Sequence, residues 1–345
     1  MSVTPINLAL QGGGAHGAFT WGVLDRLLED PEIEIAGISG TSAGALNGAA
    51  LKAGMVSGGA EAARENLDWL WGQVGAVGDL RLTHWMAAFT PGAGAVARML
   101  EFALPWSLTD AASRIVSPYV YGPFYRNPLE RVVERFDFGR VCAHIAPALF
   151  VGATNVRTGK VKIFEGDAIS TEAILASACL PTLFQAVEVT DPETGEADAY
   201  WDGGYTGNPA LFPLFAADLP EDIVVVSINP LERNEVPVSS QEIQNRINEI
   251  SFNASLLREL RAIQMVRDMI AEGQLAGGSM KDVRIHMIAD DGVMRELNVA
   301  TKLVPSPVVL SELKAAGRAA ADRFIADVKP RLGRAGTVDL HRLCD

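Results

Sequence analysis

The chain has 345 residues, of which 48% are hydrophobic, and its formal net charge is −13. The length suits one large domain, or a domain with a sizeable appendage, and the hydrophobic content is enough for a substantial core. The negative charge argues against nucleic acid, which calls for a basic footprint, and against simple electrostatic capture by anionic lipid.

The three cysteines, Cys142, Cys179 and Cys344, are widely spaced and form no CxxC pair. Because this spacing suggests no disulfide framework, we expect a reducing, cytoplasmic location. No basic segment precedes the first apolar strand, and no uncharged apolar run reaches transmembrane length. We therefore expect neither a secretion signal nor a membrane-spanning helix.

The chain opens with an apolar strand at residues 6–11, a glycine-rich loop at 12–17 (GGGAHG) and a helix at 18–29. The loop fits G-x-G-x-x-G, the dinucleotide-binding fingerprint, but it equally suits another anion held against a helix N-terminus. A dinucleotide site needs an acidic residue about 20 positions further on. The second strand, at residues 33–38, has no acid at its tip. This disfavours a nucleotide and leaves the identity of the anion open.

A sharp turn, Gly40-Thr41-Ser42-Ala43-Gly44, connects this second strand to a second helix. The turn fits G-x-S-x-G, in which the serine hydroxyl projects from a strained strand-to-helix turn and the glycines let neighbouring backbone pass close by. The helix that follows supplies backbone N–H groups and a positive dipole end. We therefore expect Ser42 to be a nucleophile and the amide of Ala43 to face a developing oxyanion.

The glycine loop and the serine turn follow adjacent strands, and open α/β sheets bind ligands where such strand ends converge. The amides of Gly12, Gly13 and Gly14 are therefore predicted to complete an oxyanion hole. The anion would be the tetrahedral intermediate of an acyl transfer, and the loss of one donor in such a hole costs about 3 kcal/mol.

Residues 60–126 are predicted to form a helical insertion, which suits a lid or a wall for an acyl chain, or simply a packed helical subdomain. Four of the six tryptophans fall in it: Trp69, Trp71, Trp85 and Trp106. Beyond the insertion we expect a hairpin at 147–164, strands at 199–202, 222–230 and 283–290, and a closing helix at 311–328. The run at 222–230 is almost entirely apolar, which is typical of a central strand. A long helix is predicted at 241–272, and we expect its apolar face to pack on the core, although a dimer contact or a lid is an alternative. This face consists of Ile243, Ile247, Ile250, Ala254 and Leu257.

The serine needs a base, and the sequence offers two arrangements. Asp202, in YWDGGYTGNPAL, leaves an apolar strand and enters a Gly-Gly loop. His286 and His341 follow it in the order Ser, Asp, His of α/β-hydrolases. His286 lies inside a strand pattern and His341 lies near the end of the sequence. These residues leave a Ser–Asp dyad and a Ser–Asp–His triad open.

The motifs together resemble those of the patatin-like phospholipase family. Residues 12–17 resemble its glycine-rich oxyanion loop, residues 40–44 its nucleophile elbow, and residues 202–204 its D-G-[GA] motif. The segment ASACLPTLF, residues 176–184, resembles a block between the elbow and the aspartate. The resemblance spans about residues 6–215, and the order and spacing of the motifs agree throughout.

This resemblance implies an α/β fold whose mostly parallel central sheet is sandwiched by helices. We expect a catalytic domain at 1–230 that contains the insertion, and a mainly helical extension at 231–345 packed on the same core. The implied site is a Ser42–Asp202 dyad without histidine, acting on acyl esters of lipids. The residues expected to support its motifs are His16, Gly17, Gly40, Gly44, Gly203 and Gly204. Many family members carry Arg or Lys where His16 stands. If that cation orients the loop, His16 would do so more weakly or only when protonated; we favour the alternative that His16 is simply a hydrogen-bonding residue of the loop.

Free aspartate has a pKa of about 3.9, which makes it a weak base at neutral pH. Burial beside Tyr200 and Trp201 would raise this pKa, so we predict a partly buried Asp202 hydrogen-bonded to Ser42. We expect a lipid acyl ester as substrate, and no metal ion, cofactor or nucleic acid. Transient contact with a membrane surface and homo-oligomer formation are left open. Two alternatives remain, namely an esterase or thioesterase for small acyl groups that uses a histidine, and a catalytically idle lipid-binding or scaffold protein.

Overall fold

A computed structural model describes residues 3–79, 117–119, 125–192, 194–275, 278, 280–297 and 306–344. The strands are β1 (Thr4–Leu10), β2 (Ile33–Thr41), β3 (Ala148–Asn155), β4 (Val161–Glu165), β5 (Val187–Thr190), β6 (Ala197–Asp202), β7 (Asp222–Val226) and β8 (Arg284–Ile288). The α-helices are α1 (Gly17–Leu27), α2 (Ala43–Asp79), α6 (Glu130–Val133), α7 (Phe138–Val141), α8 (Thr171–Ser177), α9 (Ser240–Ala271), α10 (Asp291–Glu296), α12 (Pro307–Asp327) and α13 (Leu340–Cys344). Short 3₁₀ helices are η1 (Gly14–His16), η3 (Gly166–Ala168), η4 (Gly203–Tyr205), η5 (Phe212–Phe215) and η6 (Lys329–Arg331).

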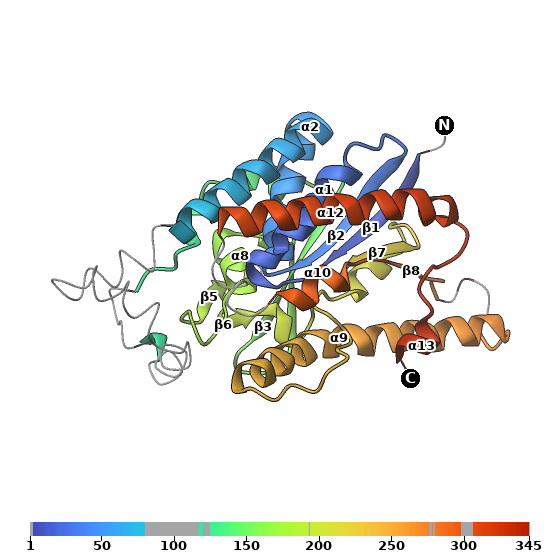
Figure 1. The fold of residues 1–345 in the computed structure, drawn as a ribbon. Helices are drawn as coiled ribbons and strands as arrows, with labels where there is room; N and C mark the ends of the chain where they lie inside the picture. Colours follow the sequence, from blue (N-terminus) through green and yellow to red (C-terminus); the bar gives the residue numbers. More distant parts are fainter. Residues whose placement is uncertain are drawn as a thin grey trace.

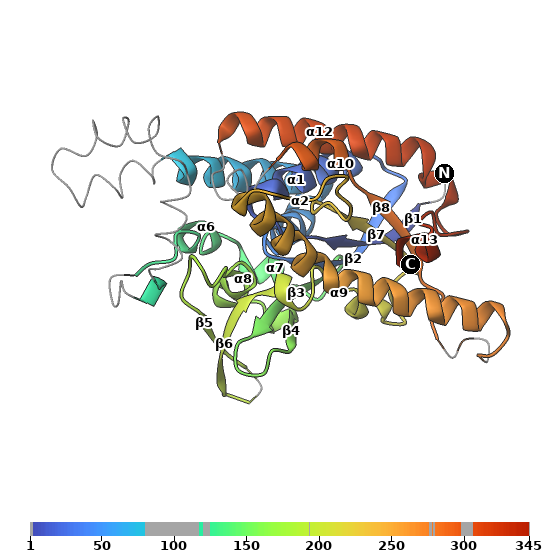
Figure 2. The same ribbon diagram turned by 60° about the horizontal axis from the view of Figure 1, so that its bottom comes forward.

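The strands form one mixed sheet in the order β5-β6-β3-β2-β1-β7-β8, with β4 paired to β3. The five strands β3, β2, β1, β7 and β8 run parallel, whereas β4, β5 and β6 are joined to their neighbours by antiparallel pairing. Figure 2 shows β4, β5 and β6 gathered at one end of the sheet, away from β7 and β8. The predicted α/β fold with a mostly parallel central sheet is confirmed.

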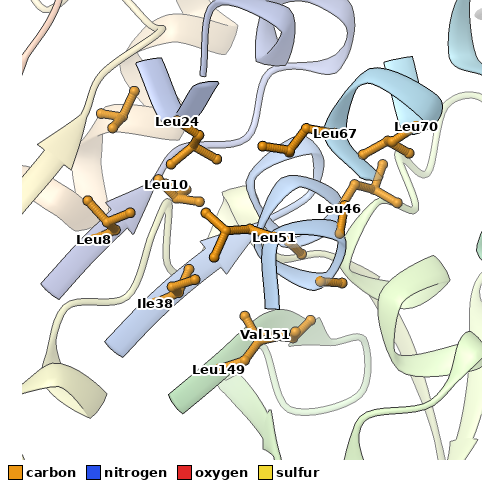
Figure 3. Close-up of a cluster of buried hydrophobic side chains, with 14 of the residues drawn as sticks. Leu8, Leu10, Leu24, Ile38, Leu46, Leu51, Leu67, Leu70, Leu149 and Val151 are labelled. Atoms are coloured by element: carbon orange, nitrogen blue, oxygen red, sulfur yellow. The ribbon is translucent and has the colours of Figure 1, made fainter. Parts of the chain in front are cut away.

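Helices cover both faces of the sheet. The helices α1, α2 and α12 lie on one side, and α9 and α13 lie on the other (Figure 1). Alternate residues of β1 separate the two cores, because Leu8 and Leu10 pack with the first group and Ala9 packs with the second. This alternation is the two-residue period of a strand buried on both faces. Figure 3 shows Leu8 and Leu10 in the first core, with Ile38 of β2 and Leu46 of α2 nearby.

Helix α2 is interrupted at Gly58 and Gly59, where the backbone is not helical. The chain then returns alongside its own first part, since Asn66 donates a hydrogen bond to the carbonyl oxygen of Ala50. Close packing at this crossing requires Gly54, where an added Cβ would collide with the backbone of residue 63.

Part of the predicted aromatic insertion belongs to this returning segment. Trp71 is buried and donates its indole N–H to Asn47 Oδ1 at 2.9 Å, and Trp69 packs edge-on against Phe136. These two tryptophans therefore pack the subdomain. Trp85 and Trp106 lie outside the described residues, and the expectation of a lid at 60–126 is not tested there.

The helix predicted at 241–272 is present as α9, but the expectation that its apolar face packs on the core is wrong for its first half. Ile243, Ile247 and Ile250 are 43%, 50% and 54% exposed. The side chains of α9 that are buried are Glu249, Asn253, Ser255, Leu256, Leu260 and Ile263. The buried side of α9 mixes polar and apolar residues, so the stripe of isoleucines in the sequence did not show which side faces the protein.

Helix α12 fulfils the expectation for the closing helix. The spacing of Leu313, Ala316, Ala320 and Phe324 predicts an inward face; Leu313, Ala320 and Phe324 are buried against the first core and Ala316 is partly buried beside them. None of the helices in the described part of the chain is both long and apolar enough to cross a membrane.

Candidate active site

Ser42 occupies the single residue between β2 and α2, with a backbone φ of 55°. It is the only described residue other than glycine with positive φ, which marks a strained turn of the kind that projects a nucleophile. The flanking glycines are needed for packing. A Cβ on Gly40 would lie 2.6 Å from the oxygen of Gly44, and one on Gly44 would collide with the carbonyl of Leu10.

Asp202 ends β6, and β3 is the strand that separates it from the serine turn. Thr41 at the end of β2 pairs with Gly152 of β3, and Asp202 pairs with the next residue, Ala153. The loop after Asp202 also touches the serine turn directly. A Cβ on Gly203 would lie 2.9 Å from Thr41 Cγ2 and would collide with the carbonyl of Gly152. The register and this close packing bring the two chain segments together.

The Asp202 carboxyl group is 1% exposed, which is more complete burial than the sequence predicted. Its Oδ1 accepts the N–H of Gly204 at 2.8 Å, and its Oδ2 has no hydrogen-bond partner among the described residues. Burial raises the pKa of Asp202 to about 7, although the Gly204 N–H and the Ser42 hydroxyl each lower it. The Ser42 hydroxyl thus lies close enough to affect the carboxyl group, and the predicted hydrogen bond between them stays a prediction.

Gly12 of the glycine-rich loop lies directly against the serine turn. An added Cβ would lie 2.7 Å from Ser42 Cβ and 2.9 Å from the oxygen of Thr41, so only glycine fits. The N–H of Gly12 donates to Asn208 Oδ1 at 2.6 Å. Of the four predicted oxyanion donors, Gly12 is therefore already engaged by a protein acceptor.

The other three predicted donors stand at helix N-termini, where backbone N–H groups lack partners within the helix. Gly13 caps η1 and Gly14 is its first residue, with a positive φ of 59°. Ala43 is the first residue of α2. The N-terminal end of α2, with its positive partial charge, therefore lies directly beside Ser42, and Gly13 and Gly14 follow the glycine that contacts Ser42.

His16 and Gly17 form the junction between the glycine-rich loop and α1. His16 is 2% exposed and occupies the residue before α1, where its side chain makes no capping hydrogen bond. A Cβ on Gly17 would lie 2.5 Å from Ala43 Cβ and 3.1 Å from Trp71, so this glycine lets α1 and the start of α2 meet. The carbonyl of Gly17 also accepts a hydrogen bond from Asn47 Nδ2 at 3.1 Å.

Ser177 has a role that sequence reasoning missed, although its segment was noted. Its hydroxyl accepts the backbone N–H of Ser42 at 2.9 Å and donates to the carbonyl of Gly152 at 2.6 Å. A completely buried serine thus ties the strained turn to β3. The motif block was a signal for the segment, but nothing local indicated a partner 135 residues away.

His286 lies in the edge strand β8, where its ring nitrogens contact Asp222 Oδ1 at 2.9 Å and Thr337 Oγ1 at 3.0 Å. Asp222 is the first residue of β7, whereas Ser42 follows the last residue of β2. Because the intervening strands are parallel, these residues lie at opposite ends of the strands. His341 is on α13, which packs against α9. The structure therefore does not bring His286 to Ser42.

The sequence profile described as "Patatin-like phospholipase" matches residues 8–217, more than half of the chain. Among curated protein sequences, none matches the chain. Similar solved structures include VipD from Legionella pneumophila, with 13% identity, a TM-score of 0.41, and coverage of 94% of this chain and 67% of VipD. Another is the ExoU–SpcU complex from the type III secretion system of Pseudomonas aeruginosa, with 16% identity, a TM-score of 0.31, and coverage of 99% and 74%. The profile match spans the glycine-rich loop, the serine turn and Asp202, so the chain belongs to the patatin-like phospholipase family, and its general class is that of lipid acyl hydrolases.

Proposed function

We propose that this protein is a serine hydrolase that cleaves carboxylic ester bonds of lipids, in the manner of a phospholipase A or a lysophospholipase. Ser42 is the nucleophile and Asp202 is the general base. The observation that carries the proposal is the fully buried Asp202, with one unpartnered oxygen and a pKa of about 7, close to a serine on a strained turn. A carboxyl group with a pKa near the working pH is suited to take and return a proton.

In acylation, Asp202 takes the proton of the Ser42 hydroxyl while Oγ attacks the ester carbonyl carbon. The carbonyl oxygen becomes negative and is stabilised by the backbone N–H groups of Gly13, Gly14 and Ala43. Collapse of the tetrahedral intermediate breaks the ester bond, and the departing alkoxide takes the proton from Asp202. The acyl group is then bonded to Ser42.

In deacylation, Asp202 takes a proton from water as the water oxygen attacks the acyl-enzyme. The second tetrahedral intermediate uses the same oxyanion donors. Its collapse returns the proton to Ser42 Oγ and releases the fatty acid. The cycle uses the ester, one water molecule and groups of the chain itself.

The division into a catalytic domain at 1–230 and an extension at 231–345 remains a proposal. The extension supplies β8 to the central sheet and α12 to the first core. Transient contact with a lipid surface and self-association also remain proposals, as does a cytoplasmic location.

The proposed function is tested with a fluorophosphonate probe and a panel of phospholipids, lysophospholipids and soluble esters. We expect the probe to label the wild-type protein and to leave Ser42→Ala unlabelled, and we expect Ser42→Ala to hydrolyse no lipid. His286→Ala serves as the control for the alternative triad and should label and turn over like the wild type. A folded wild-type protein that neither labels nor hydrolyses any ester would favour the idle lipid-binding protein. Loss of labelling in His286→Ala would favour the triad.

A further inference from the structure

Both backbone polar groups of Gly12 are held by buried side-chain amides. The N–H of Gly12 donates to Asn208 Oδ1 at 2.6 Å, and its carbonyl accepts from Asn229 Nδ2 at 2.9 Å. The Asn208 amide also reaches the same carbonyl at 3.4 Å. Asn208 and Asn229 are at most 1% exposed. Gly12 is therefore fixed from two directions, by residues that follow β6 and β7.

Helix α9 holds these amides in turn. The hydroxyl of Ser255 accepts the N–H of Asn208 at 3.2 Å. Asn253 Oδ1 accepts Gln11 Nε2 at 3.1 Å, and the same Gln11 nitrogen reaches the carbonyl of Asn208 at 3.3 Å. Asn253 Nδ2 also donates to the carbonyl of Asn229 at 3.3 Å. Two residues of α9 thus reach Gly12 through a single intermediate residue each.

The placement of Gly12 matters because it touches Ser42 and precedes Gly13 and Gly14. The N–H of Gly12 already donates to Asn208, so Gly12 serves to fix the loop in place. The N–H groups of Gly13 and Gly14 are then the ones left to donate to the oxyanion. Oxyanion donors are effective when they are fixed before the reaction begins, because they then need no reorganisation in the transition state. The uncharged amides that fix Gly12 also add no charge beside Asp202.

We infer that Asn208, supported by Ser255 and Asn253 of α9, is a positioning residue that holds the glycine-rich loop against Ser42. Since α9 lies beyond residue 217, where the family match ends, the catalytic unit extends past the matched region. The kinetic part of this inference rests on the proposed function, whereas the anchoring of the loop does not. If the amides served only to fill the interior, their loss would lower stability without changing turnover in the folded enzyme.

The test compares Asn208→Ala and Ser255→Ala with Ser39→Ala as a matched control. Ser39 is also buried and donates to Ala210 O at 2.5 Å, so the control loses a hydroxyl contact to the same segment without touching Asn208 or Gly12. Ser255→Thr retains the hydroxyl acceptor and should behave like the wild type. All variants are measured as full-length protein below their melting temperatures.

Two readouts are used. Hydrogen–deuterium exchange over residues 8–19 should be faster in Asn208→Ala and Ser255→Ala than in the wild type and Ser39→Ala. On a water-soluble p-nitrophenyl ester, Asn208→Ala should lower kcat by about 10-fold to 100-fold while KM stays unchanged, which is the size expected for misplaced catalytic groups. Ser255→Ala should lower kcat less, in the same direction, and it serves as the test variant if Asn208→Ala does not fold.

Unchanged exchange in the loop would overturn the inference, and so would unchanged kcat in a variant whose loop exchanges faster. A decrease in kcat that is as large in Ser39→Ala would also overturn it. If the wild type turns over no ester, the proposed function fails, and the exchange comparison alone then decides whether Asn208 anchors the loop.

Discussion

Two buried aspartates, Asp202 and Asp222, sit in opposite electrostatic environments. Asp222 accepts hydrogen bonds from Arg284, His286 and the N–H of Gly333, and these partners lower its pKa to about 2 against the effect of burial. Asp202 receives one backbone N–H at Oδ1, and burial raises its pKa to about 7. Both side chains are almost completely buried.

Burial alone does not distinguish a carboxylate with a structural role from one that takes part in chemistry. Asp222 is held permanently ionised by its partners, so it can secure the end of the sheet but cannot exchange a proton near neutral pH. Asp202 is left short of partners, so its charged form is costly and its proton is exchangeable at neutral pH. We expect substitutions of the two residues to have opposite consequences.

The largest expected effect is the loss of turnover in Asp202→Asn. An asparagine keeps the shape but cannot take the proton of Ser42, and we expect kcat to fall by about a factor of 1,000 or more. Stability should not decrease, since a buried charge with an unpartnered oxygen is removed. The measurement is kcat on a soluble ester together with urea unfolding.

Asp198→Asn is the matched control, because Asp198 lies on the same strand and its carboxylate binds Asn155 and Arg157. It should retain turnover. Full activity in Asp202→Asn would contradict the assignment of Asp202 as the general base.

The next effect is on stability, in Asp222→Asn. This change removes the charge that pairs with Arg284 and one of the two carboxylate oxygens that accept hydrogen bonds, and breaking such a buried pair costs about 3 kcal/mol. The folded variant should keep the turnover of the wild type. Urea unfolding measures the expected loss of stability, and kcat measures the expected unchanged turnover. A variant that is as stable as the wild type but inactive would contradict both expectations.

The remaining effect is on how stability depends on pH, to which the two residues contribute with opposite signs. The pKa of Asp202 is raised on folding from 3.8 to about 7, so the folded state keeps a proton that the unfolded chain loses, and its contribution to stability declines as pH rises from about 4 to 7. The pKa of Asp222 is lowered from 3.8 to about 2, so its contribution, about 2 kcal/mol, is present above pH 4 and is lost as pH falls from about 4 to 2.

The free energies of unfolding of Asp202→Asn and Asp222→Asn should therefore depend on pH differently from that of the wild type. Relative to the wild type, Asp202→Asn should gain stability as pH rises from 5 to 8. The deficit of Asp222→Asn should shrink below pH 4. Glu259, whose pKa is also raised to about 7, contributes with the same sign as Asp202, so only the difference from the wild type isolates Asp202. Parallel curves for all three proteins would show that the two carboxyl groups do not differ as described.

The sequence predicted the sheet, the serine turn and the Asp-Gly-Gly loop because these depend on local patterns. An apolar run followed by G-x-S-x-G defines a strand, a turn and a helix, and parallel strands bring their carboxyl ends to one edge. The same reasoning placed Asp202 at a strand end. It underestimated the burial of Asp202, which depends on the loops that close over it.

The parts that could not be predicted depend on contacts between distant segments. The bond between Ser177 and Ser42 spans 135 residues, and the bond between Gln11 and Asn253 spans 242. Nothing near these polar residues indicates their partners. The prediction of which side of α9 faces the core was wrong for the same reason. Its isoleucines formed a clear stripe, but the buried side of the helix is a different one, where Asn253 binds Gln11 and Asn229 and where Ser255 binds Asn208.

The most direct test of the central claim is the pH dependence of kcat/KM on a soluble, non-ionising ester. Because Asp202 must be ionised to accept the Ser42 proton, wild-type activity should rise with pH around an apparent pKa of about 7 and then level off. In Asp202→Asn the residual activity should lack this rise. The same rise near pH 7 in both proteins would contradict the assignment of Asp202 as the base.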